Sequence, residues 1–117
     1  MSIRAITEMN GKIAIIEIKG SLVGDADTDK FRSAVQDFIE QGNKLLVVNL
    51  SKVNYMNSSG IGSMISAYTS YKKVGGEIKL AGLTNNVHNV LVISKLIDFF
   101  DVHDTVDEAI DSFAKKK

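Results

Sequence analysis

The sequence predicts an α/β fold: a mixed β-sheet with an N-terminal hairpin and about four helices packed on it. Near the N-terminus two short apolar runs flank an Asn-Gly pair, a strong hairpin signal because both residues tolerate positive φ. From about residue 25 onward, segments with helical spacing of apolar residues alternate with short apolar runs. That alternation is typical of strands joined by helices. No linker or repeat divides the 117 residues, so one domain over 1–117 is expected.

The hairpin is expected at residues 3–8 and 12–19, around Asn10-Gly11. A polar stretch at 24–29 follows, and then apolar residues recur at helical spacing as far as Gly42. These residues are Phe31, Ala34, Val35, Phe38 and Ile39. They predict a first helix.

The aspartates before that helix, Asp25, Asp27 and Asp29, are expected to cap it and to complement its dipole. Their spacing also imitates the start of a calcium loop. Lys30 and Gln36 occupy the positions where such a loop needs glycine and a bidentate glutamate, so no metal site is expected there.

Residues 45–50 form a short run rich in branched side chains, which predicts a central strand covered on both faces. A second helix is expected from Ser58, and Gly75-Gly76 supplies a left-handed stop. Its apolar side contains Ile61, Met64, Ile65, Tyr68 and Tyr71. Tyr55, Met56, Tyr68 and Tyr71 belong more often to a core than to an interface, although half-exposed tyrosines are enriched at binding sites.

The C-terminal third continues the alternation. A strand is expected at 77–81, a short helix capped by Asn85-Asn86, and a small edge strand within 97–102. That helix would carry Val87, Val90, Leu91 and Ser94. Thr105-Val106-Asp107-Glu108 matches a capping box, and the last helix would run into the basic residues 115–117.

Composition limits the classes of function. Lys and Arg number 14, as do Asp and Glu, so no net field favours nucleic acid or an anionic membrane. The absence of cysteine removes disulfides, thiolate catalysis and sulfur-ligated zinc. Neither a signal peptide nor a run of about 20 apolar residues is present, so a cytoplasmic protein is expected. Its partner is expected to be a protein or a small molecule.

Enzymatic motifs are missing. No phosphate cradle with Gly-Lys-Ser or Gly-Lys-Thr occurs, so no nucleotide cofactor is expected. No Gly-x-Ser-x-Gly elbow accompanies the two histidines, His88 and His103, which are both interpreted as solvated. The sequence offers no catalytic residues.

The segment Met56-Asn57-Ser58-Ser59-Gly60-Ile61-Gly62 joins the central strand to the second helix and places a serine hydroxyl at the helix start. Ser58 has two interpretations. It is an N-cap that accepts a backbone N–H, the more common role, or it carries a phosphate that the helix N-terminus favours. Gly60 and Gly62 would leave the first helical turn bare, so that another molecule can approach closely.

The chain resembles the STAS domain family, and within it the stand-alone anti-sigma factor antagonists of bacteria. The resemblance covers nearly the whole chain. It rests on Gly20-Ser21-Leu22, Leu46 to Leu50, Tyr55-Met56-Asn57-Ser58-Ser59-Gly60-Ile61-Gly62, Gly75-Gly76 and Leu96 to Phe100.

The resemblance implies a STAS-like fold and a partner switch. In such switches the antagonist binds an anti-sigma factor serine kinase, the kinase phosphorylates the serine of the turn, and a PP2C-type phosphatase restores it. By position that serine is Ser58, with Ser59 the fallback. The implied partner-binding surface contains Asn57, Ser58, Ser59, Gly60, Gly62, Leu22, Val23 and Asp25.

The chain departs from the family pattern at two positions. Asn57 stands where the family usually has Asp, and Val23 stands where the sporulation-type antagonists tend to carry Asp. Both departures remove negative charge beside Ser58, and Asp25 is the candidate to replace it. The alternative function is therefore a STAS adaptor or scaffold that is not phosphorylated, in a signalling or lipid-transport assembly.

Overall fold

A computed structural model describes residues 2–115 of the chain, and it confirms the α/β fold. The sheet order is β1-β2-β3-β4-β5; β1 is antiparallel to β2, and β2 to β5 are parallel. The elements in chain order are β1 (Ser2–Glu8), β2 (Ile13–Leu22), α1 (Asp25–Glu40), β3 (Leu45–Met56), α2 (Ser58–Lys73), β4 (Glu77–Ala81), α3 (Asn85–Ile93), β5 (Asp101–His103) and α4 (Val106–Lys115). The predicted central strand is β3, six residues longer than expected because it continues to Met56.

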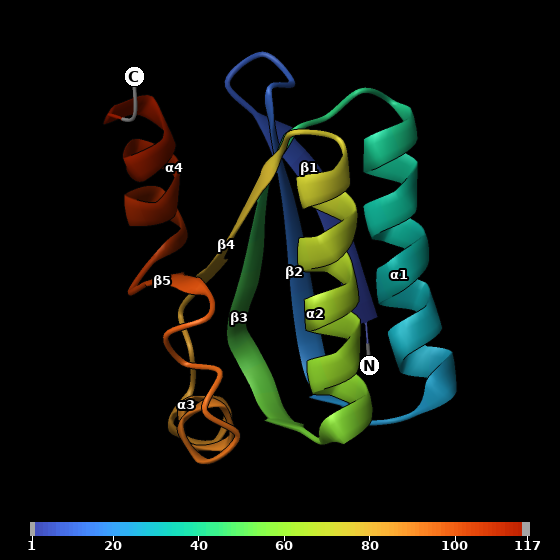
Figure 1. The fold of residues 1–117 in the computed structure, drawn as a ribbon, viewed down its shortest axis with the longest axis vertical. Helices are drawn as coiled ribbons and strands as arrows, with labels where there is room; N and C mark the ends of the chain where they lie inside the picture. Colours follow the sequence, from blue (N-terminus) through green and yellow to red (C-terminus); the bar gives the residue numbers. More distant parts are fainter. Residues whose placement is uncertain (1, 116–117) are drawn as a thin grey trace.

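Helices cover both faces of the sheet. Helices α1 and α2 lie side by side on one face, and α4 lies on the other side of the strands (Figure 1). The larger core lies under α1, α2 and α3 and includes Phe31, Met64 and Leu91. A smaller core lies under α4, where Phe113 packs with Ile15 and Val47. Because β2 and β3 are covered on both faces, their apolar residues run almost without interruption.

The N-terminal hairpin is confirmed. Asn10 and Gly11 are the central residues of the turn, both with positive φ (59° and 84°), and the Lys12 N–H donates to the Met9 carbonyl oxygen. Met9 is also left-handed, so the paired strands end at Glu8 and begin again at Ile13. This leaves a four-residue loop, 9–12, where the expected strands left three residues.

The structure corrects two helix caps. The aspartates do not cap α1: its N-cap is Gly24, which makes no side-chain cap, and Asp25 and Asp27 lie inside the first turn. The cap of α3 is Thr84 rather than Asn85-Asn86, because the Thr84 hydroxyl accepts from the Val87 N–H. In both cases a residue one step earlier has the extended backbone that a cap requires.

The predicted stop of α2 is confirmed, and so is the Thr105 half of the capping box of α4. Gly75 has a φ of 75°, and the Gly76 N–H returns to the Tyr71 carbonyl oxygen. At α4 the Thr105 hydroxyl accepts from the Glu108 N–H at 3.1 Å. Residues 116 and 117 of the predicted basic tail lie outside the described residues.

The edge strand and one histidine differ from expectation. Strand β5 covers only Asp101–His103, so it overlaps the end of the expected 97–102 segment and runs one residue past it. His88 is exposed as predicted, but the prediction of a solvated His103 is wrong. His103 is only 20% exposed, and its Nε2 lies 3.0 Å from Asp101 Oδ1. Asp101 also pairs with Lys79, a lysine buried on β4.

Candidate functional site

The start of α2 is the candidate site, and Asn57 organises it. The Asn57 Oδ1 accepts from the Ser59 N–H at 3.0 Å and from the Gly60 N–H at 3.2 Å. Its Nδ2 donates to the Val23 carbonyl oxygen at 2.9 Å. Asn57 is therefore the N-cap of α2 and also ties α2 to the connection between β2 and α1.

This assignment rules out one of the two interpretations of Ser58, in which its hydroxyl is the N-cap. Ser58 is the first residue of α2 and is exposed. Its hydroxyl makes no hydrogen bond within residues 2–115. A free serine hydroxyl at a helix N-terminus can act as a phosphoryl acceptor, and the helix dipole favours the negative charge that a phosphate adds.

The predicted surface residues divide into two groups. Ser58 and Asp25 are exposed, whereas Asn57, Ser59, Gly62 and Val23 are partly exposed. The structure brings these residues to the end of the molecule where β2 and β3 finish and α1 and α2 begin (Figure 1). They can form one continuous contact surface.

Leu22 and Gly60 form the second group, because both are buried. A Cβ on Gly60 would lie 2.4 Å from the Leu22 carbonyl oxygen and 2.9 Å from Met56 Cβ. Gly60 is therefore required for packing inside the protein, and neither residue can present a side chain to a partner. Gly62 has open space where its Cβ would lie, so only Gly62 fits the expected bare turn.

The residues Tyr55, Met56, Tyr68 and Tyr71 differ in how far they are buried. Tyr71 and Met56 are core residues as expected, whereas Tyr55, at the end of β3, is 48% exposed. Tyr68 is half-buried and lies against Phe99, with ring centroids 4.5 Å apart. Of the predicted core residues Tyr55, Met56 and Tyr71, Tyr55 is therefore the one with an accessible ring.

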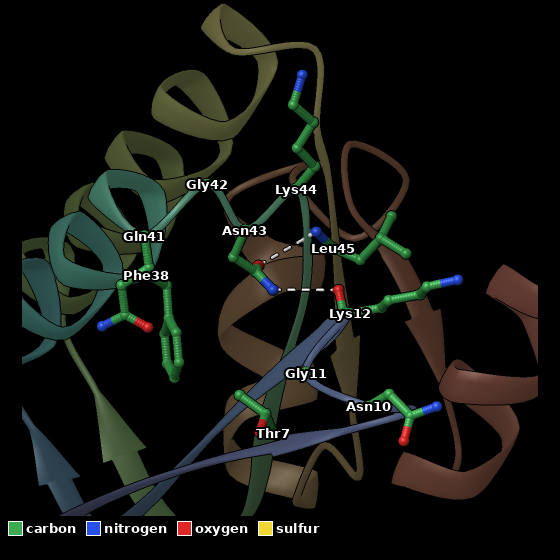
Figure 2. Close-up of a pocket in the computed structure, with 10 residues that line it drawn as sticks. All are labelled: Thr7, Asn10, Gly11, Lys12, Phe38, Gln41, Gly42, Asn43, Lys44 and Leu45. Atoms are coloured by element: carbon green, nitrogen blue, oxygen red, sulfur yellow. Dashed lines mark hydrogen bonds between the residues drawn. The ribbon is translucent and has the colours of Figure 1, made fainter.

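A hollow of about 420 Å³ lies at the opposite end of the sheet, between the hairpin turn and the start of β3. In Figure 2 the amide of Asn43 crosses it, donating to the Lys12 carbonyl oxygen and accepting from the Leu45 N–H. The Tyr71 hydroxyl donates to the same Asn43 oxygen at 2.9 Å. This hollow contains none of the predicted site residues, and its central amide is used for structure.

No group of acidic or histidine residues suited to a metal ion occurs within residues 2–115. Over the same residues, every helix is too short or too polar to cross a membrane.

A family model for the STAS domain matches residues 4–109. The chain belongs to the STAS domain family. This STAS domain is similar to the anti-sigma-B factor antagonist of Bacillus subtilis (strain 168), with 29% identity over 89 residues, 74% of this chain and 81% of the relative.

Solved structures share the STAS fold. A Thermotoga maritima protein superposes with a TM-score of 0.87 at 20% identity, over 97% of this chain and 95% of that protein. The anti-sigma factor antagonist SpoIIAA in its unphosphorylated form has a TM-score of 0.75 at 20% identity, covering 97% of this chain and 99% of SpoIIAA. SpoIIAA of Bacillus in its phosphorylated form also has a TM-score of 0.75.

The site residue that sequence reasoning missed is Asn57 in its capping role. Its signal was present, because asparagine is as good an N-cap as serine. Two cap-type residues stand next to each other, and local sequence does not choose between Asn57 and Ser58. The choice depends on the Val23 carbonyl oxygen, which is 34 residues away in the chain.

Proposed function

We propose that this STAS domain protein is an anti-sigma factor antagonist that acts in a partner switch. The unmodified protein binds an anti-sigma factor that is also a serine kinase, and phosphorylation at Ser58 releases it. A PP2C-type phosphatase reverses the modification, and the cycle takes place in the cytoplasm. The proposal is supported by the family, by the name of the Bacillus subtilis relative and by the accessible hydroxyl of Ser58.

The observation that carries the proposal is that Asn57, and not Ser58, caps α2. Because Asn57 accepts the Ser59 and Gly60 N–H groups, the Ser58 hydroxyl is not needed for capping. The hydroxyl can therefore react without loss of the helix cap. In the transfer, Ser58 Oγ forms a bond to the γ-phosphorus of ATP, the bond to ADP breaks, and the hydroxyl proton is released.

The phosphate would act on the docking surface rather than on the fold. It adds about −1.5 to −2 charges and three acceptor oxygens. The Asn57 oxygen already occupies the Ser59 and Gly60 N–H groups, so the phosphate is expected to project outward from the helix. A kinase surface that fits the neutral turn of Ser58, Ser59 and Gly62 would then be opposed by the size and the negative charge of the phosphate.

Binding of two Ser58 variants tests the switch. The probe is the anti-sigma serine kinase encoded in the same genome, immobilised and supplied with ATP. Ser58→Ala should stay bound, whereas the parent should be released and gain about 80 Da in intact mass. Ser58→Glu should bind at least about tenfold more weakly, because a carboxylate occupies the docking surface.

Ser59→Ala is the matched control, since it removes the neighbouring hydroxyl of the same turn. It should bind and gain mass like the parent. If Ser59→Ala is the variant that fails to gain mass, the modified residue is Ser59. Equal binding by the parent, Ser58→Ala and Ser58→Glu would refute the switch.

A second candidate function is a constitutive STAS adaptor. The observation in its favour is Asn57, whose neutral amide caps α2 at the position where the family usually has a carboxylate. An adaptor should show no added mass when it is isolated from its own cells. It should also bind its partner equally well with and without ATP.

A further inference from the structure

The outer edge of β1 lies open within the described part of the chain. Strand β1 ends the sheet order and pairs only with β2. Of its seven residues, only Ile3 is partly buried, and Ile6 is 38% exposed. An open edge presents a row of backbone N–H and C=O groups to which another strand can pair.

Strand β1 carries exposed charged side chains but lacks other features that prevent edge pairing. It contains no proline and no lysine, and its pairing with β2 is regular from Ser2 to Glu8. Natural edges are commonly protected by such residues, by bulges or by a covering loop. The edge of β1 is therefore suited to accept a strand.

The side chains of β1 indicate which kind of strand would pair with its outer edge. Arg4, Ile6 and Glu8 lie on one face of the strand, where they line a hollow of about 260 Å³ together with Ile15 and Val106. Within residues 2–115 neither Arg4 nor Glu8 has an ion pair. The nearby Glu17, opposite Arg4 in register, is 3.7 Å from Lys52.

We propose that a second copy of this chain pairs antiparallel along β1, with Ile6 opposite Ile6 on the two-fold axis. This register places Arg4 opposite Glu8 of the partner, and the symmetry repeats that pair. Two ion pairs would then flank an apolar contact on the same face of the joined sheets. Opposite charges placed directly across a strand pair are stabilising, and like charges are destabilising.

The proposed interface leaves the Ser58 site free. Ser58 lies at the start of α2, after β3, whereas the pairing uses the outer edge of β1 on the far side of β2. Only the five residues from Arg4 to Glu8 pair in this register. Such a contact is small compared with stable dimer interfaces, so the dimer should form in a concentration-dependent way.

Charge-swap variants test the dimer by sedimentation equilibrium over a concentration series. The average mass of the parent should rise from 12.8 kDa toward twice that value. Arg4→Glu and Glu8→Arg should each weaken association by at least about tenfold, because each places like charges opposite one another twice. The double variant Arg4→Glu with Glu8→Arg should return to within about threefold of the parent, since the pairs are restored with reversed sign.

Lys73→Glu is the control, because it makes the same change in net charge as Arg4→Glu on an exposed residue of α2. It should associate like the parent. A parent that stays monomeric at millimolar concentration would overturn the proposal. So would single variants that associate normally, or a double variant that does not recover.

Discussion

At the scale of single residues, the pair Asn57 and Ser58 decides what the start of α2 can do. Both residue types are good N-caps, but only the asparagine amide can accept two N–H groups and also donate to the Val23 carbonyl oxygen. A serine at position 57 would have a shorter side chain with a single hydroxyl. The result is an exposed Ser58 hydroxyl that is not committed to the fold.

The Asn57 contacts predict a measurable loss of stability. Asn57→Ala removes the cap and the bond to Val23 and should lower the free energy of unfolding by about 1–3 kcal/mol. Asn57→Asp keeps the acceptor role and should remain within about 1 kcal/mol of the parent, because it loses only the donor to Val23. Urea unfolding measures both differences.

Asn89→Ala is the matched control for that series, because Asn89 is an exposed asparagine on α3. It should change the unfolding free energy by less than about 0.5 kcal/mol. An Asn57→Ala variant as stable as Asn89→Ala would contradict the capping role.

At the scale of elements, the parallel pairing of β2 and β3 places the end of β2 against the first turn of α2. The register brings Leu22 beside Met56, so the Leu22 carbonyl oxygen reaches the position where Gly60 would carry a Cβ. Gly62, two residues further along, faces open space. The two glycines of one motif therefore have different physical roles.

Alanine substitutions should separate these roles. Gly60→Ala should destabilise the protein by about 1–3 kcal/mol, because the new methyl group collides with backbone that cannot easily move. Gly62→Ala should stabilise it by about 0.5–1 kcal/mol, since alanine loses less conformational entropy in a helix. Thermal or urea unfolding distinguishes the signs, and the same sign for both variants would contradict the assignment.

At the scale of the whole molecule, the end opposite Ser58 is held by a buried polar network. Asn43 joins the hairpin turn, the start of β3 and α2, through Lys12, Leu45 and Tyr71. Burial raises the pKa of the Tyr71 phenol above its ordinary value, because the charged form would lose its hydration. The neutral phenol is therefore part of the folded structure.

This pKa shift predicts a loss of stability at alkaline pH. The unfolded chain releases the Tyr71 proton at about pH 10, whereas the folded protein retains it, so the stabilisation is complete below about pH 10 and declines above it. Tyr71→Phe should be less stable than the parent by about 1 kcal/mol near pH 7. The difference should shrink as the pH rises above about 10.

Urea unfolding of the parent and Tyr71→Phe, once near pH 7 and once above about pH 10, measures this effect. Tyr55→Phe is the control, because the Tyr55 ring is 48% exposed and should leave stability unchanged at both pH values. A gap between the parent and Tyr71→Phe that is independent of pH would contradict the prediction.

The sequence predicted most of the fold because the elements carry local signals. The apolar spacing from Phe31 onward identified α1, and Asn10-Gly11 identified the hairpin turn. The errors lie at element ends, where Thr84 and Gly24 cap their helices in place of the expected residues. The polar partners Lys79, Asp101 and His103 were also missed, because they come from two different strands that pair only in the folded sheet.

By itself, the sequence determined the order of helices and strands, the helix that begins at Ser58 and the resemblance to the STAS family, because these follow from short-range patterns and motifs. Only the tertiary structure decided that Asn57 caps the helix, that Gly60 is required inside the protein and that Ser58 is free. The physical reason is that the Asn57 cap depends on the backbone oxygen of Val23 and the Gly60 requirement on that of Leu22, and Ser58 is free because Asn57 is the cap. Those oxygens come near α2 only after β2 and β3 pair in their parallel register.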